Sequence, residues 1–180
     1  MTEIQTLLLN NQTKILIVVD MQAGFKTEAN EHIYNNINKI NFNDYEYVFA
    51  TKFQNIRDKN SNYFDLLHYD FMTTDMDTKI LLPKNIKYIE VKKSSYALPK
   101  NTLNKILSIY KTSDKKEVHI VGTDYDSCVL AIGFQLFDAG LQPRFYYDLI
   151  GSHSSDTIKL NNLKKIYVKN FGKNCFINER

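Results

Sequence analysis

Short, wholly apolar runs alternate with longer amphipathic stretches along most of this chain. The run Ile15–Val19 carries no polar residue and stops at Asp20, which is typical of a strand buried on both faces of a sheet. In the stretch Glu28–Ile40 that follows, isoleucines recur at the spacing of one helix face. The same pattern predicts further strands at Tyr45–Thr51, Tyr88–Val91, Val118–Val121, Arg144–Tyr147 and Lys165–Val168, and further helices at Tyr63–His68, Leu103–Tyr110 and Val129–Ala139.

Strands that alternate with helices predict βαβ units and a parallel sheet covered on both faces. Because the crossovers between parallel strands are right-handed, we expect an α/β fold of three layers, α/β/α, around a doubly wound, mostly parallel six-stranded sheet of Rossmann-like type. The 180 residues suit one compact domain, and no linker or internal repeat divides them. We therefore expect a single domain over residues 1–180.

Composition narrows the range of partners. The chain has 23 basic and 20 acidic residues, a balance that argues against nucleic acid or membrane binding. No apolar run reaches the roughly 20 residues that a membrane-spanning helix needs. Two cysteines favour a reducing compartment over a disulfide framework, and Met1–Lys14 lacks the pattern of a signal peptide. These features lead us to expect a cytoplasmic protein whose partner is a small molecule.

Three reactive side chains follow predicted strands. Asp20 ends the first strand, Lys93 follows the third and Cys128 follows the fourth. Ligands of open α/β sheets bind at the carboxyl ends of the strands, so we expect these side chains to converge there. A thiol, a carboxylate and an ammonium could serve as nucleophile, proton-transfer group and electrostatic partner.

Cys128 also stands where a strand ends and a helix begins. Backbone N–H groups and the helix dipole favour an anion there, which predicts a lowered pKa for the thiol and a stronger nucleophile. The first strand is not followed by Gly-x-Gly-x-x-Gly, which argues against a nucleotide-binding, flavodoxin-like protein.

Three segments together resemble the isochorismatase-like cysteine hydrolase superfamily, which includes nicotinamidases, N-carbamoylsarcosine amidases and isochorismatases. The family patterns are Asp-x-Gln-x-x-Phe, Lys-x-x-Tyr-Ser-Ala-Phe and Gly-x-x-Thr-Asp-x-Cys-Val. Here they correspond to Asp20-Met-Gln22-Ala-Gly-Phe25, Lys93-Ser-Ser-Tyr96-Ala-Leu98 and Gly122-Thr-Asp-Tyr-Asp126-Ser-Cys128-Val129. Their order and spacing fit from about residue 14 to residue 148, and each segment follows a predicted strand.

The resemblance implies the isochorismatase-like hydrolase fold and a set of roles. Cys128 would be the nucleophile that forms a thioester, Asp20 would relay protons, and Lys93 would orient Asp20 and hold the thiolate. The family also has a cis peptide bond before the nucleophile, here between Thr123 and Asp124. That bond would turn the backbone N–H of Asp124 toward that of Cys128 to form an oxyanion hole. No cofactor is implied. Family resemblance and the 12 tyrosines and 11 phenylalanines suggest a homo-oligomer, a dimer or a tetramer.

Some positions depart from the family patterns. Metal-containing nicotinamidases carry Asp-x-His after the second strand, whereas this chain has Thr51-Lys52-Phe53-Gln54-Asn55 there. The four histidines form no ligand pair at that spacing, so we expect no metal. Lys92 lies beside Lys93 and is an alternative for the catalytic lysine. We favour Lys93, because it stands three residues before Tyr96 as the family pattern requires.

The leading hypothesis is a metal-independent hydrolase that cleaves a C–N bond in a small amide. Two alternatives stay open, an isochorismatase-type vinyl-ether hydrolase and a catalytically silent protein that binds a small metabolite. Phe25, Phe53, Tyr96 and Tyr125 are candidates for substrate contact. Asp126 is expected to cap the Cys128 helix, and His153 either to lie in a surface loop or to contact substrate.

Overall fold

The computed structural model describes residues 15–59, 61–112, 117–154 and 160–177, so Met1–Lys14 lies outside the described part of the chain. In chain order its elements are β1 (Ile15–Val19), η1 (Ala23–Phe25), α2 (Glu31–Asn36), η2 (Ile37–Lys39), η3 (Phe42–Asp44), β2 (Tyr47–Phe53), α3 (Ser61–Asp65), β3 (Ile89–Lys93), α4 (Lys100–Ile109), η4 (Tyr110–Thr112), β4 (Glu117–Thr123), α5 (Cys128–Asp138), β5 (Gln142–Gly151), α6 (Leu160–Phe171) and β6 (Phe176–Ile177).

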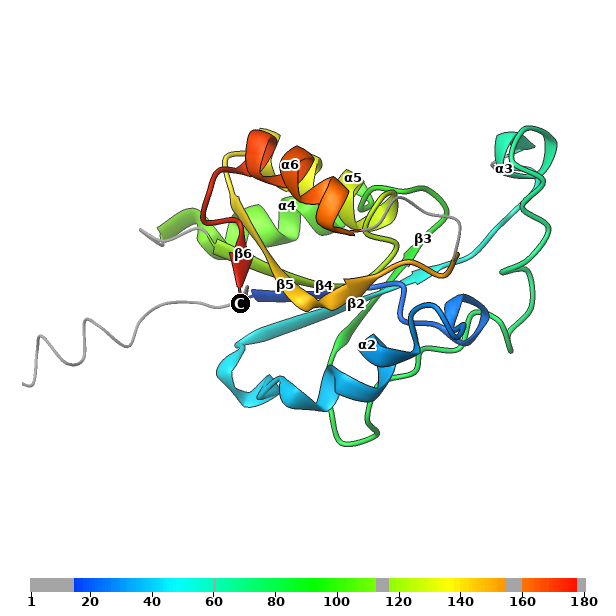
Figure 1. Ribbon diagram of the computed structural model, residues 1–180, viewed down its shortest axis with the longest axis horizontal. Helices are drawn as coiled ribbons and strands as arrows, with labels where there is room; N and C mark the ends of the chain where they lie inside the picture. The colour runs from blue at the N-terminus through cyan, green and yellow to red at the C-terminus, as the bar shows by residue number, and fades with distance from the viewer. Residues whose placement is uncertain (1–14, 60, 113–116, 155–159, 178–180) are drawn as a thin grey trace, which may run out of the picture.

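The strands form one six-stranded sheet in the order β3-β2-β1-β4-β5-β6, and every neighbouring pair is parallel. Helices α4, α5 and α6 cover one face, and α2 covers the other (Figure 1). The predicted α/β fold, with three layers around a six-stranded parallel sheet, is confirmed. The chain runs outward from β1 through β2 to β3 and then returns to β4 on the other side of β1. The crevice at the carboxyl ends of β1 and β4, where the strand order reverses, is the expected place for a ligand.

The central strand β1 explains the first apolar run. Ile15, Ile17 and Val19 belong to the core cluster under α4, α5 and α6, whereas Leu16 and Val18 belong to the cluster under α2. All five side chains are buried. A parallel strand between two helical layers has no polar face, and so its sequence does not alternate.

The predicted sixth strand is wrong. Lys165–Val168 lies inside α6, and the sixth strand is Phe176–Ile177. The buried side chains of this helix, Leu163 and Tyr167, stand four residues apart, which is a helical spacing. The short apolar run within Lys165–Val168 resembles a strand when it is read without the residues on either side, which reveal the helical spacing.

Other boundaries moved by a few residues. β2 continues to Phe53 and β3 to Lys93, so Lys93 is the last residue of its strand. The helix predicted over Glu28–Ile40 is a short α2 followed by the 3-10 turn η2. The buried side chain of Asn30 holds the chain before α2 in a turn, because it accepts from the Thr27 N–H (2.9 Å) and donates to the Phe25 carbonyl (2.8 Å). Among the described residues, no helix is long and apolar enough to cross a membrane.

Gly122 sets how closely β1 and β4 approach at their carboxyl ends. It pairs with Val19, has φ of 118°, and a Cβ at this position would lie 2.0 Å from the Val19 carbonyl oxygen. We predict that Gly122→Ala lowers the free energy of unfolding by more than about 3 kcal/mol, because backbone atoms cannot move aside as a side chain can. Urea denaturation of the purified variant measures the loss.

Gly140→Ala is the matched control. Gly140 also has positive φ, 79°, but nothing lies within 4 Å of its would-be Cβ. It should therefore lose only the cost of the left-handed conformation, about 1–2 kcal/mol. Equal losses in the two variants would contradict the assigned role of the close contact at Gly122.

Candidate active site

Three strands and one helix bring Asp20, Lys93 and Cys128 together. Asp20 follows the last residue of β1, Lys93 ends β3, and Cys128 begins α5 after β4. The Lys93 Nζ lies 2.7 Å from Asp20 Oδ2 and 3.3 Å from Cys128 Sγ. The side chains of Asp20 and Lys93 are fully buried. The sheet thus assembles a carboxylate, an ammonium and a thiol from positions far apart in the sequence.

Strand alternation separates the two neighbouring lysines. Lys93 is buried at the end of β3, whereas Lys92 points to the other side and is exposed. The Lys93 ammonium also donates to the Ser95 carbonyl (3.0 Å), so three acceptors surround it. Burial lowers the pKa of Lys93, but the charge of Asp20 and the hydrogen bonds to Asp20 and Cys128 raise it, and the net effect is a raised pKa. Lys93 therefore remains a cation inside the protein.

Thr51 on β2 fixes the Asp20 carboxylate. Asp20 has φ of 47°, a left-handed conformation that costs a residue with a side chain about 1–3 kcal/mol. Its N–H donates to Thr51 Oγ1 (2.9 Å), and the Thr51 hydroxyl donates to Asp20 Oδ1 (2.6 Å). These bonds leave the other carboxylate oxygen directed at Lys93. Sequence reasoning missed Thr51, because nothing but the β1–β2 pairing reveals this contact.

Gln22 joins the ends of β1 and β2. Its side chain accepts from the Phe53 N–H (2.8 Å) and donates to the carbonyls of Phe53 (2.9 Å) and Thr78 (3.0 Å). Gln22 is fully buried, and its own carbonyl accepts from the Tyr34 hydroxyl (3.0 Å). The glutamine of the first sequence segment therefore has a structural task, which is to hold the loop beside Asp20.

The predicted lowering of the Cys128 pKa is wrong. Burial raises the pKa of the thiol above its ordinary value, the Lys93 ammonium lowers it, and the charge of Asp20 raises it again. Burial prevails because an anion shut away from water loses its hydration. The Cys128 side chain is therefore a neutral thiol beside the Asp20–Lys93 ion pair.

The backbone N–H groups of Asp124 and Cys128, two residues of the pocket wall, are the predicted oxyanion donors. The peptide bond between Thr123 and Asp124 is cis. The N–H groups of Ser127 and Val129 both donate to the Asp124 carbonyl (3.2 and 2.9 Å). In contrast, no carbonyl of the described residues accepts from the N–H of Asp124 or of Cys128. Helix α5 starts without a side-chain cap, so the expectation that Asp126 caps it is wrong.

A pocket of about 220 Å³ opens next to Cys128. Its walls include the side chains of Phe25, Phe53 and Tyr96, which were predicted to contact substrate, and also Tyr63 and Tyr69. Tyr125 is not part of this wall. It is buried in the core cluster under α4, α5 and α6, and its carbonyl accepts from the Tyr167 hydroxyl.

His153 and Asp124 form a pair in the same pocket wall. The His153 N–H donates to Asp124 Oδ1 (2.8 Å), and His153 Nδ1 lies 2.6 Å from Asp124 Oδ2. Phe25 packs on the imidazole edge to face, with ring centroids 5.6 Å apart. The hydrogen bond to Asp124 raises the pKa of His153 despite the opposing effect of burial. His153 lies in the loop after β5 and in the pocket wall, and its contact with substrate stays a prediction.

No group of three or more His, Cys, Asp or Glu side chains in the described ranges is arranged to hold a metal ion. The residues at the positions of the Asp-x-His of metal-containing nicotinamidases form hydrogen bonds within the protein. Thr51 binds Asp20, and the Asn55 amide donates to the Tyr69 carbonyl (2.5 Å).

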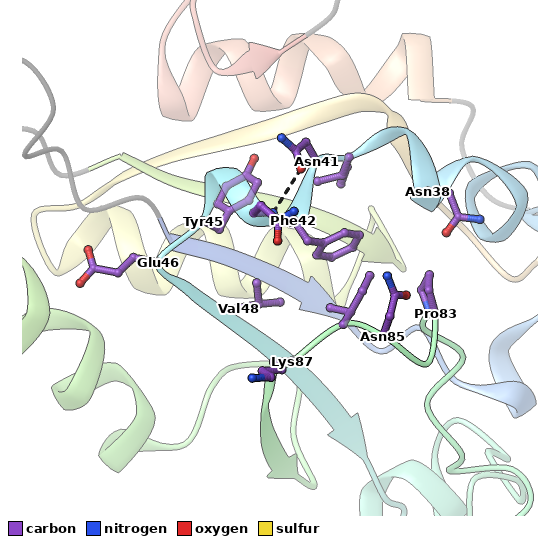
Figure 2. A pocket seen from close by; sticks show the side chains of 12 residues that line it. Asn38, Asn41, Phe42, Tyr45, Glu46, Val48, Pro83, Asn85 and Lys87 are labelled. Atoms are coloured by element: carbon purple, nitrogen blue, oxygen red, sulfur yellow. Dashed lines mark hydrogen bonds between the residues drawn. The ribbon is translucent and has the colours of Figure 1, made fainter.

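A larger pocket, of about 700 Å³, lies near the amino ends of β2 and β3, at the end of the strands opposite to Cys128. Figure 2 shows it between the segment that carries Asn38, Asn41 and Tyr45 and the segment that carries Pro83 and Asn85. Both segments lead into the amino ends of strands. It contains neither Cys128 nor Lys93, so the smaller pocket is the candidate active site.

No family model matches the chain, and no curated protein matches it by sequence. Solved structures do match. The nicotinamidase/pyrazinamidase from Bacillus subtilis superposes with a TM-score of 0.73 at 16% identity, over 93% of this chain and 100% of that chain.

Two further solved structures match over similar lengths. The N-carbamoylsarcosine amidase from Thermoplasma acidophilum has a TM-score of 0.70 at 17% identity, over 89% of this chain and 94% of that chain. A cysteine hydrolase from Pseudomonas syringae pv. phaseolicola has a TM-score of 0.68 at 17% identity, over 88% and 86% of the two chains. The protein therefore has the isochorismatase-like hydrolase fold that its sequence segments predicted.

Proposed function

We propose that this protein is a cysteine hydrolase that cleaves the C–N bond of a small amide without a metal ion. The observation that carries the proposal is the contact of the Cys128 thiol with the buried Asp20–Lys93 pair, at 3.3 Å from Lys93 Nζ. Proteins that share the fold include a nicotinamidase/pyrazinamidase and an N-carbamoylsarcosine amidase, whose names denote small amides as substrates. The pocket volume of about 220 Å³ also suits a small substrate.

In the first half of the reaction, Cys128 Sγ attacks the amide carbonyl carbon while its proton passes to Asp20. The backbone N–H groups of Asp124 and Cys128 stabilise the oxyanion, and one such donor is worth on the order of 10²–10³ in rate. Asp20 then returns the proton to the nitrogen of the leaving amine, the C–N bond breaks, and a thioester remains.

In the second half, a water molecule gives a proton to Asp20 and attacks the thioester carbonyl. The C–S bond breaks, the acid product leaves, and the sulfur regains the proton from Asp20. Lys93 holds the Asp20 carboxylate in place in both halves and stabilises negative charge on sulfur. Because the resting thiol is neutral, its activation depends on proton transfer during attack.

The two alternatives fit the pocket less well. Isochorismate carries two carboxylates, and the pocket wall already contains Asp126, which forms no ion pair with a described residue. Like charges would repel such a substrate. A protein that only binds a metabolite would have no need for the strained Asp20, whose φ is 47°, beside a buried thiol.

We predict that an amide panel yields hydrolysis and an acyl adduct on Cys128, seen by mass spectrometry. Cys128→Ala should lose more than about a thousandfold in turnover, because no other group can form the thioester. Cys175→Ala is the control, since it removes the other buried thiol, outside the pocket.

Turnover should persist after dialysis against a strong chelator. Loss of activity on chelation that zinc or iron restores would contradict the metal-independent mechanism. If the wild type forms no adduct and hydrolyses nothing faster than Cys128→Ala does, the hydrolase proposal itself fails.

A second prediction separates the roles of Asp20 and Lys93. The wild-type thiol should react slowly with iodoacetamide at neutral pH and faster as the pH rises through its raised pKa, above the value of about 8.5 for a free thiol. Asp20→Asn removes a charge that raises this pKa and leaves the one that lowers it. Alkylation of Cys128 at pH 7 should therefore speed up, while amide hydrolysis falls.

Peptide mapping distinguishes alkylation at Cys128 from alkylation at Cys175. Asp138→Asn, on the exposed side of α5, is the matched control and should leave both rates as in the wild type. Slower alkylation in Asp20→Asn, or a wild-type midpoint below that of a free thiol, would refute the neutral-thiol mechanism.

We also propose that the protein is a homo-oligomer. Leu66 and Leu67, next to α3, and Met76 are 71%, 55% and 81% exposed, and α3 stands away from the sheet (Figure 1). Exposed apolar side chains of this kind gather at subunit contacts. Light scattering should give a mass of two or four times 21.1 kDa, and a mass of one chain at working concentration would refute the proposal.

A further inference from the structure

Aromatic rings form much of the wall of the pocket beside Cys128. They come from different segments of the chain and are Phe25, Phe53, Tyr63, Tyr69 and Tyr96. Tyr63 and Tyr96 pack edge to face with centroids 5.2 Å apart, and Phe25 and Phe53 lie 6.1 Å apart. The face of an aromatic ring carries partial negative charge, and a group of such faces attracts cations.

The charged groups around this pocket are mostly already neutralised. Lys93 is paired with Asp20 at 2.7 Å. Both oxygens of Asp124 are engaged, Oδ1 by the N–H of His153 and the hydroxyl of Thr123, and Oδ2 by Nδ1 of His153. These pairs therefore contribute little net charge to a ligand in the pocket.

Asp126 is the exception. Its half-buried side chain lines the pocket, yet no lysine, arginine or histidine of the described ranges forms an ion pair with it. It provides no side-chain cap for α5 either, because that helix starts without one. Burial and the nearby Asp124 carboxylate raise the pKa of Asp126, whereas a backbone hydrogen bond and the charge of His153 lower it, and the net effect is a raised pKa.

We propose that the pocket selects a small amide whose acyl group carries a positively charged nitrogen, held by Asp126 and by the aromatic rings. This inference rests on the proposed function, since it names the substrate class of the same site. The cation would lie against the aromatic wall and supply the missing counter-charge, while the amide carbonyl faces Cys128. An acyl group with a carboxylate would meet the unpaired charge of Asp126 and bind poorly. The volume of about 220 Å³ restricts the substrate to a small one.

Three amides of simple structure test this specificity. Trimethylammonioacetamide carries the cation, tert-butylacetamide is its uncharged isostere with carbon in place of nitrogen, and malonamate carries an anion. The first two differ in charge but hardly in shape, so the ratio of their kcat/KM values isolates the contribution of charge. We expect the cation to be preferred over the isostere by about tenfold or more, and malonamate to be the poorest of the three.

Asp126→Asn should reduce the preference for the cation by about tenfold, whereas Asp126→Glu, which keeps the charge, should retain most of it. Asp138→Asn removes an exposed carboxylate from α5 and is the control, with the wild-type ratio expected. A general loss of activity from a disturbed helix would lower both kcat/KM values and leave their ratio unchanged. An unchanged ratio in Asp126→Asn, or a wild-type preference for the isostere or for malonamate, would overturn the inference.

Binding to Cys128→Ala, followed by calorimetry, distinguishes this inference from the proposed function. Tighter binding of trimethylammonioacetamide than of tert-butylacetamide, lost on adding Asp126→Asn, supports the cation site even if the wild type hydrolyses neither compound. Equal binding of the two compounds, together with hydrolysis of other amides by the wild type, would leave the hydrolase intact and refute the cation site.

Discussion

A lysine ammonium that has no access to water needs a negative charge close by, and in this protein the Asp20 carboxylate supplies it. The Lys93 Nζ lies 2.7 Å from the Asp20 carboxylate and 3.3 Å from the thiol. Removing one member of a buried ion pair typically costs about 3–5 kcal/mol, so the pair constrains everything packed around it. The ends of β1, β2 and β3 must keep their register for the contact to exist. Thr51 on β2, bonded to Asp20, is part of the same constraint.

This constraint also sets the chemistry. The thiol is buried enough that its neutral form is favoured, and the ammonium beside it offsets only part of that effect. In the proposed mechanism, a neutral nucleophile next to a carboxylate couples attack to proton transfer, and the proton that leaves sulfur passes to the Asp20 carboxylate, which Lys93 holds in place. The site therefore avoids a permanently ionised thiolate, which would attract oxidants and metals.

The pocket in front of the thiol has a different character. Aromatic rings line much of its wall, and Asp124 and His153 in the same wall are joined by contacts of 2.8 and 2.6 Å. Because that pair neutralises itself, we assign recognition in our proposal to the rings and to Asp126. The reacting end of the pocket is thus built by the sheet, whereas its recognition surface comes mainly from loops, which vary more easily than strands.

The sequence by itself determined the sheet and the reactive residues. Ile15–Val19 and Val118–Val121 had to be buried strands, because a parallel strand between two helical layers is apolar on both faces. Asp20, Lys93 and Cys128 were found because each follows such a strand. The tertiary structure alone decided what depends on contacts between distant segments. It raised the thiol pKa through burial, brought Thr51 to Asp20 and His153 to Asp124, and moved Tyr125 into the core. It also assigned Lys165–Val168 to a helix, because the face of α6 that packs on the sheet joins Tyr167 of that run to Leu163 and Phe171 outside it.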